Sequence, residues 1–210
     1  MENTEKKIAN LLLQNKAIKL NPAKPFQWAS GWKSPIYCDN RKTLSYPDIR
    51  TTIKQEFVNL INEKFEKVEA IAGVATGAIA QAALVAEMMS LPLLYVRSSA
   101  KSHGLENLVE GDPQPGQRIV VIEDLISTGG SSLKAVEALR QIDCNVIGMV
   151  AIFTYGFKQS ENKFKEAECT LYTLSNYEVL IDQALETGYI SSEQIEVLKK
   201  WRLDPENWLK

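Results

Sequence analysis

The sequence predicts an α/β protein with a mostly parallel central sheet flanked by helices. Short apolar segments alternate with amphipathic segments from residue 47 to residue 187. This alternation is typical of parallel strands joined by helices that cover both faces of a sheet. The segment Ile119–Ile122 consists of four consecutive β-branched apolar residues, as expected of a strand buried on both faces.

The composition bounds the size and class of the protein. The chain has 210 residues and is 45% hydrophobic, which allows one α/β domain with terminal additions. A net charge of −2 gives no basic field that would indicate nucleic-acid binding. Cys38, Cys144 and Cys169 lack the spacing of a metal site. Because we find neither a signal-peptide pattern nor an apolar span, we expect a soluble cytoplasmic protein without membrane or nucleic-acid partners.

Residues 1–45 are expected to form an N-terminal helix and a small hood or flap. Apolar residues recur among charged ones in residues 4–20, which predicts an amphipathic helix over that range. Ser-Gly and Ser-Pro turn signals separate short extended pieces in residues 26–41, and they predict a hairpin or flap.

The core sheet is expected within residues 46–175 of a single domain. Pro47 is typical of a helix start and predicts a helix over residues 47–66. A strand over residues 69–74 is followed by a turn in which Gly77 permits close backbone approach, and then by an Ala-rich helix to Met89. Further strands are predicted at residues 92–97, 119–122, 145–155 and 169–174, with a polar helical or irregular segment at 162–168.

Residues 176–210 are expected to form C-terminal helices. A helix over residues 176–187 is followed by Gly188, a residue typical of helix ends. Ser191 and Gln194 form a capping-box pattern, which predicts a last helix through Trp201.

Residues 98–117 join two predicted strands without clear periodicity. Segments of this length in a compact domain are usually functional lids or disordered. The only histidine of the chain, His103, lies here, with Arg97 and Lys101 nearby. Three potential cations on one segment suit an anionic ligand, and a solvated charged loop is the alternative interpretation.

Residues 119–132 contain the strongest functional pattern. Glu123 and Asp124 stand at the end of the buried strand, a loop of hydroxyl residues and glycines (127–132) follows, and an amphipathic helix comes next. Ligands of open α/β sheets bind outside the carboxyl ends of the strands. Glycine amides at a helix N-terminus suit a phosphate, and carboxylates accept hydrogen bonds from sugar hydroxyls. The pattern therefore suggests a ribose 5-phosphate site.

The alternative interpretation is structural: a buried strand, a polar turn and a capped helix. The segment is not a Walker A loop, because no Gly-Lys-Ser/Thr follows at the required spacing. It is not a Gly-x-Gly-x-x-Gly dinucleotide fingerprint either. The length and order of the whole pattern favour a ligand site.

Three segments carry a resemblance to a known family. Residues 119–132 resemble the phosphoribosyl diphosphate (PRPP) signature of type I phosphoribosyltransferases. Ser-Gly-x-x-Ser-Pro-x-Tyr at 30–37, with Asp39-x-Arg41 after it, resembles the segment that covers the pyrimidine in orotate phosphoribosyltransferases. Arg-x-x-x-Lys-x-His-Gly at 97–104 resembles their catalytic loop. The resemblance implies the type I phosphoribosyltransferase fold and Mg²⁺-dependent transfer of ribose 5-phosphate from PRPP to orotate.

The resemblance also implies residue roles. Arg97, Lys101 and His103 would stabilise the leaving pyrophosphate, Glu123 and Asp124 would hold the ribose hydroxyls, and these five are the candidate catalytic residues. The residues implied to bind PRPP are Arg97, Lys101, His103, Glu123, Asp124, Leu125, Ile126, Ser127, Thr128, Gly129, Gly130 and Ser131. Ser127 would also lie near orotate. Mg²⁺ would be bound mainly through PRPP, and a homodimer is implied in which the catalytic loop reaches the other subunit.

The chain departs from the family pattern at three positions. Many members have a lysine where this chain has Ser98, a lysine where it has Ala29, and an arginine where it has Gly156-Phe157. Lys33 or the flap backbone is our hypothesis for the replacement of the missing orotate contacts. Two alternative functions stay open: transfer to another nucleobase, and PRPP sensing by a regulator on the same fold.

Overall fold

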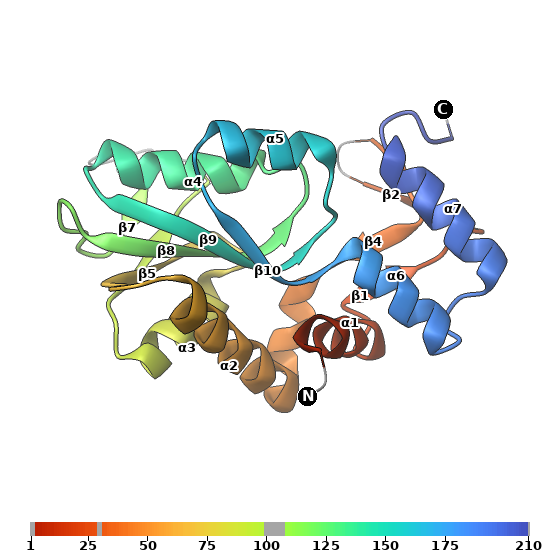
Figure 1. Ribbon diagram of the computed structural model, residues 1–210, viewed down its shortest axis with the longest axis horizontal. Helices are drawn as coiled ribbons and strands as arrows, with labels where there is room; N and C mark the ends of the chain where they lie inside the picture. The colour runs from red at the N-terminus through yellow and green to blue at the C-terminus, as the bar shows by residue number, and fades with distance from the viewer. Residues whose placement is uncertain (1–2, 29–30, 99–107, 210) are drawn as a thin grey trace.

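The computed structural model describes residues 3–28, 31–98 and 108–209. Its main sheet has six strands in the order β10-β9-β8-β5-β6-β7 (Figure 1). All neighbours are parallel except β7, which is antiparallel to β6. The strands are β5 (Ala70–Val74), β6 (Leu93–Val96), β7 (Val109–Glu110), β8 (Arg118–Ile126), β9 (Asn145–Thr154) and β10 (Leu171–Asn176). The predicted fold class is confirmed.

Helices cover both faces of this sheet (Figure 1). The helices packed on the sheet are α1 (Thr4–Gln14), α2 (Pro47–Lys64), α3 (Ile79–Met89), α4 (Gly130–Gln141) and α5 (Lys158–Glu166). The last two helices, α6 (Tyr177–Glu186) and α7 (Ser192–Leu203), follow β10 and lie at one end of the molecule (Figure 1). Strand β8 places Ile119 and Val121 in the core under α4 and α5, and Val120 and Ile122 in the core shared with α1, α2 and α3. Alternate side chains of one strand are thus buried on opposite faces, as predicted for Ile119–Ile122.

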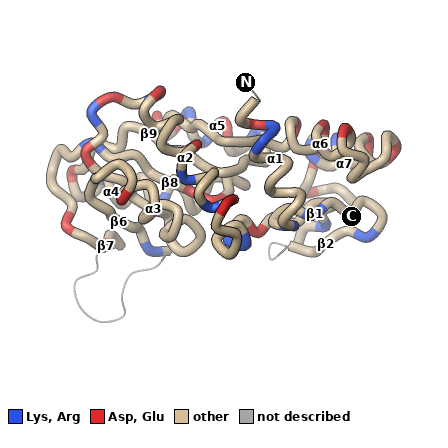
Figure 2. The backbone as a smooth tube through the Cα atoms, turned by 90° about the horizontal axis from the view of Figure 1, so that it is seen from below, with Lys and Arg blue, Asp and Glu red and all other residues tan. Residues whose placement is uncertain are grey.

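A hood stands beside the sheet. It contains the antiparallel pairs β1 (Ile18–Leu20) with β4 (Ile36–Cys38) and β2 (Phe26–Gln27) with β3 (Lys33–Ser34). The predicted flap is therefore a short hairpin followed by a strand. A 3₁₀ helix, η1 (Asn40–Ser45), leads from the hood to α2. Figure 2 shows β6, β7, α3 and α4 at one end of the molecule and β1, β2, α6 and α7 at the other.

An aromatic cluster joins the hood to the end of β9 and to the C-terminal helices. Its members are Trp28, Trp32, Tyr155, Phe157, Tyr177 and Trp201. Trp201 is fully buried and Tyr155 is 2% exposed. Burial of several large rings, with added ring–ring attraction, makes this cluster a firm contact between segments far apart in the sequence.

Three predicted boundaries were wrong. The first helix ends at Gln14, not residue 20, because Lys16 adopts a φ of 57° and Ile18–Leu20 pairs with Ile36–Cys38 as a strand. The strand predicted at 119–122 continues to Ile126, because pairing with β9 extends beyond the acidic pair. The helix near residue 162 begins earlier, at Lys158, and the capping box of Ser191 is confirmed.

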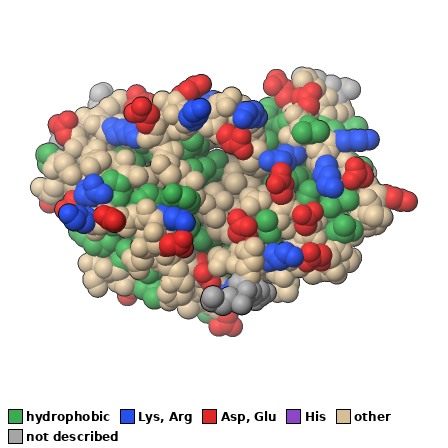
Figure 3. All heavy atoms as spheres, in the orientation of Figure 1, with side chains coloured by type: hydrophobic (Ala, Val, Ile, Leu, Met, Phe, Trp, Pro, Cys, Tyr) green, Lys and Arg blue, Asp and Glu red, His purple; other side chains and the backbone are tan. Residues whose placement is uncertain are grey.

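The surface carries charges of both signs. On the face drawn in Figure 3, basic and acidic side chains are interspersed. Among the described residues, no helix combines the length and apolar character that crossing a membrane requires.

Candidate active site

The carboxyl ends of β5, β6 and β8 meet at one edge of the sheet. The turn 75–78 follows β5, Arg97 follows β6, and the acidic pair and the loop 127–131 lie at the end of β8. Parallel strands with their carboxyl ends together leave a crevice where ligands bind in open α/β sheets. The structure thus brings together four of the predicted site segments.

Glu123 is the more buried acid of the pair, at 5% exposure. Its Oε2 accepts a hydrogen bond from Ser132 Oγ at 2.8 Å, and its Oε1 accepts one from the Asp124 amide at 2.9 Å. Burial, with a further contribution from the Asp124 charge, raises the pKa of Glu123 to about 8. At neutral pH this side chain is therefore largely a neutral carboxylic acid that both donates and accepts hydrogen bonds.

Asp124 lies beside the turn that follows β5. A Cβ on Gly77 would come within 2.5 Å of Asp124 Oδ2, so only glycine leaves the carboxylate where it is. The Asp124 carbonyl accepts a hydrogen bond from Asn40 Nδ2 at 2.6 Å. Asn40 is 2% exposed and belongs to η1. The Asp124 backbone is therefore bonded by η1, and its carboxylate lies close to the turn after β5.

The lack of space between Gly77 and Asp124 leads to a prediction for Gly77. Replacing Gly77 with alanine is expected to lower kcat/KM for the proposed reaction by at least about tenfold, because misplacing a group by about 1 Å can cost that much or more. Steady-state kinetics would measure the loss. Gly188→Ala is the control: that glycine follows α6, outside the site, and a Cβ there would meet nothing within 4 Å, so only the strain of its positive φ (70°) is expected to act, as a loss of stability. An equal effect of both substitutions would contradict the prediction.

The loop 127–131 leads into α4. Gly129 has a φ of 78° and precedes the first helical residue, Gly130. A Cβ on Gly130 would meet nothing within 4 Å, and Ser131 is exposed. The first amides of a helix have no partner within the helix, and the open space beside Gly130 leaves room for an anion at this N-terminus. Ile126 is fully buried, so its side chain serves the core.

A pocket of about 430 Å³ lies next to this loop. Gly130 and Ser131 line one side, and Arg97 and Ser98 line another. Arg97 Nη1 is 3.5 Å from Glu110 Oε1. Lys134 also lines the pocket and was not among the predicted residues. The predicted Lys101 and His103 lie outside the described residues, so their positions are not part of this geometry.

Two of the three departures from the family pattern, Ser98 and Gly156-Phe157, fall among the described residues. Phe157 is 3% exposed and belongs to the aromatic cluster. Lys33 is exposed, and its Nζ donates a hydrogen bond to the Leu209 carbonyl at 2.9 Å. Ala29 lies outside the described residues. The idea that Lys33 replaces the missing lysine remains a hypothesis.

Sequence reasoning missed two supporting residues. The sequence predicts Ser132 only as a hydroxyl residue of the loop, whereas its Oγ donates a hydrogen bond to Glu123. Asn40 lies inside the Asp39-x-Arg41 pattern, and its amide reaches a carbonyl 84 residues away. A small polar residue at the first turn of α4 could have suggested the first contact, but no local signal reveals the second.

Known proteins match the chain over nearly its whole length. The phosphoribosyl transferase domain family matches residues 44–185. The orotate phosphoribosyltransferase of Phocaeicola vulgatus is 63% identical over 208 residues, covering 99% of this chain and 98% of that protein. The chain belongs to the orotate phosphoribosyltransferase family. The one from Listeria monocytogenes is 50% identical over 97% of this chain and 98% of its own length.

A solved orotate phosphoribosyltransferase shares the architecture. The structure from Aeropyrum pernix has a TM-score of 0.76 and 27% identity, covering 88% of this chain and 99% of that one. The general domain match, 44–185, leaves out the hood and α7, whereas the orotate phosphoribosyltransferases match these parts too. The features that distinguish an orotate phosphoribosyltransferase from the wider family are therefore best sought in the hood and in α7.

Proposed function

We propose that this protein transfers ribose 5-phosphate from PRPP to N1 of orotate, releasing pyrophosphate and forming orotidine 5′-phosphate in de novo pyrimidine (UMP) biosynthesis. One observation supports this most strongly. In a chain of the orotate phosphoribosyltransferase family, an acidic pair is followed by a loop of hydroxyl residues and glycines and by the N-terminus of α4, with open space beside Gly130. A diol and a phosphate in one ligand match those two features.

The loop 127–131 binds the 5′-phosphate through backbone amides and hydroxyls. Glu123 and Asp124 hold the ribose hydroxyls, and Leu125 and Ile126 contribute through the main chain. This arrangement fixes C1 of the ribose relative to the base. Ser127, the first residue of the loop, also lies near orotate in this proposal.

The bond between C1 and the pyrophosphate oxygen breaks with its electron pair leaving on pyrophosphate, the orotate N1 supplies the pair for the new bond to C1, and the proton of N1 is released to the pyrophosphate or to water. Positive charge builds up on the ribose while negative charge builds up on the leaving group. Asp124 stabilises the first charge. Arg97, Lys101 and His103 stabilise the second. Closing the 98–117 loop excludes water, which would otherwise react at C1.

Mg²⁺ fits this site as an ion carried by the substrate. Among the described residues, no group of three or more acidic, His or Cys side chains is arranged to hold a metal. The oxygens of PRPP would therefore supply most of the Mg²⁺ ligands, and the Asp124 carboxylate would be the protein group that could add one. When bound, Mg²⁺ would neutralise part of the pyrophosphate charge.

We also propose a homodimer in which the catalytic loop of one subunit serves the site of the other, and a cytoplasmic location. The dimer is supported by the family resemblance of residues 97–104. The location is supported by the three cysteines, which are free thiols, as is usual in reducing compartments. A single domain with the hood in residues 1–45, the sheet in 46–175 and helices in 176–210 completes the proposal.

Lys101 offers a direct test of the catalytic loop. Replacing Lys101 with alanine is expected to lower kcat by at least about tenfold, because one preorganised charge at the leaving group is removed. Loss of orotate ultraviolet absorbance would measure turnover. Lys165→Ala, in α5, is the control. Unchanged kcat in the Lys101 variant would remove this residue from the mechanism.

A further inference from the structure

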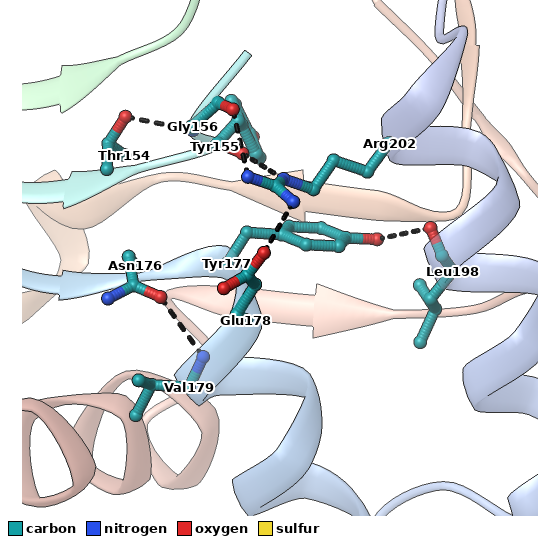
Figure 4. Close-up of polar contacts among 9 residues, drawn as sticks. All are labelled: Thr154, Tyr155, Gly156, Asn176, Tyr177, Glu178, Val179, Leu198 and Arg202. Atoms are coloured by element: carbon teal, nitrogen blue, oxygen red, sulfur yellow. Dashed lines mark hydrogen bonds and ion pairs between the residues drawn. The ribbon is translucent and has the colours of Figure 1, made fainter. Parts of the chain in front are cut away.

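The C-terminal helix α7 bonds two segments, the turn after β9 (Figure 4) and the flap. Arg202 Nε donates a hydrogen bond to the Tyr155 carbonyl, and Arg202 Nη2 donates one to the Gly156 carbonyl, both at 3.0 Å. One residue earlier, Trp201 Nε1 donates to the Lys33 carbonyl of the flap at 3.3 Å. Adjacent residues of α7 thus bond the backbone of the turn after β9 and of the flap.

Hydrogen bonds also connect the turn after β9 with the end of β8. The Tyr155 amide donates to the Ile126 carbonyl at 3.1 Å, and Thr154 Oγ1 donates to the same carbonyl at 3.4 Å. The Gly156 amide donates to Thr154 Oγ1 at 3.0 Å (Figure 4). Ile126 directly precedes Ser127, the first residue of the phosphate loop. Arg202 thus bonds the Tyr155 carbonyl, the Tyr155 amide bonds the Ile126 carbonyl, and Ile126 is the residue before the loop.

The guanidinium lies tightly against the turn. Gly156 has a φ of 63°, and a Cβ there would be 2.9 Å from Arg202 Nη2. Trp28 packs on Tyr155 with ring centroids 5.1 Å apart, and Trp32 packs on Phe157 at 6.4 Å. A shift of this turn would therefore move the two tryptophans of the flap as well.

Arg202 also forms an ion pair with a residue of α6. Its Nη1 is 2.7 Å from Glu178 Oε1 of α6 (Figure 4). The Glu178 side chain is 69% exposed, and exposed ion pairs contribute little free energy. The two hydrogen bonds from Arg202 to the backbone carbonyls are less exposed than this ion pair, and their donor is charged. They are therefore expected to contribute more free energy than the ion pair.

We propose that Arg202 is a positioning residue for orotate binding. It fixes the carbonyls of Tyr155 and Gly156 and so sets the place of the flap relative to the Ser127 loop. The chain lacks an arginine directly after β9, and α7 brings one to the backbone of that turn from elsewhere in the sequence. The inference rests on the proposed function, because it concerns the affinity for the base.

The test is an Arg202→Met variant, which keeps an unbranched apolar stem and removes the three bonds. We expect the KM for orotate to rise about tenfold, as the loss of a charged hydrogen bond implies. The KM for PRPP is expected to change less than about twofold, because the α4 end of the phosphate loop stays in place. Arg202→Lys is expected to recover part of the orotate affinity.

Two controls separate positioning from general stability. Arg140 makes the same kind of contact far from the flap, to the carbonyls of Ala167 at 2.7 Å and Glu168 at 3.1 Å. Arg140→Met is expected to lower the thermal midpoint without changing either KM. Glu178→Gln, which removes only the exposed partner of Arg202, is expected to leave both KM values unchanged.

The outcomes distinguish this inference from the proposed function. A wild-type protein that does not turn over orotate overturns both. If the wild type is active, an orotate KM that changes no more in Arg202→Met than in Arg140→Met overturns the positioning role alone. An equal rise in both KM values, with no recovery in Arg202→Lys, overturns it as well.

Discussion

Replacing Asp124 with asparagine is expected to lower kcat by about 10²–10³-fold, the range seen when one preorganised electrostatic partner of a transition state is removed. Asn keeps the shape of the side chain, so the close contact with Gly77 and the bond from Asn40 to the Asp124 carbonyl are retained. What is lost is the negative charge beside the ribose, where positive charge develops as the C1–O bond breaks. The KM for PRPP is expected to change much less than kcat.

The measurement is steady-state kinetics at saturating PRPP and Mg²⁺, with circular dichroism to show that the variant is folded. Asp182→Asn, on the exposed face of α6, removes the same charge away from the site and is expected to be fully active. A tenfold higher KM for PRPP with unchanged kcat would contradict the prediction. That result would make Asp124 a ground-state contact only.

Glu123→Gln is expected to stabilise the protein relative to the wild type as the pH rises. The pKa of Glu123 is about 8 in the folded protein, against an ordinary value of 4.5, because the carboxyl group is buried beside Asp124. Below pH 4.5 both the folded and unfolded states hold the proton. Between pH 4.5 and 8 the unfolded state ionises while the folded state does not, so the wild type loses stability. Glutamine has no such loss.

The expected difference in free energy of unfolding grows by up to about 4 kcal/mol across this window, since one pKa unit corresponds to about 1.4 kcal/mol. Urea unfolding of both proteins at pH 5, 6, 7 and 8 would measure it. Glu87→Gln, on the exposed face of α3, is the matched control. A difference between Glu123→Gln and the wild type that stays constant across these pH values would show that Glu123 is ionised in the folded protein.

Much of the fold was predictable because it depends on local patterns. The β-branched segment at 119–122, Pro47 at a helix start and the capping box at Ser191 each specify structure within a few residues. The acidic pair and the loop 127–131 are contiguous with β8, so their relative placement also followed from the sequence. The first helix was predicted too long because Ile18, seven residues after Leu11, continues the helical spacing of the apolar residues although it belongs to a buried strand.

The contacts that hold the site are mostly non-local, and local patterns do not reveal them. Asn40 reaches the Asp124 carbonyl, and Arg202 reaches the turn after β9, across 84 and about 46 residues respectively. Ser132 is only nine residues from Glu123, but their contact requires β8 and the first turn of α4 to be in place. These contacts form only when the sheet and the hood are assembled, so they can be identified only in the folded structure.

The proposed reaction can be measured by the change in orotate ultraviolet absorbance when purified protein is mixed with PRPP and Mg²⁺. We expect a loss of absorbance that requires PRPP, together with release of one pyrophosphate per orotate consumed. Two results would contradict it. Turnover with another nucleobase but not with orotate would keep the phosphoribosyl site and remove the pyrimidine assignment. Binding of PRPP without turnover of any base would indicate a PRPP sensor.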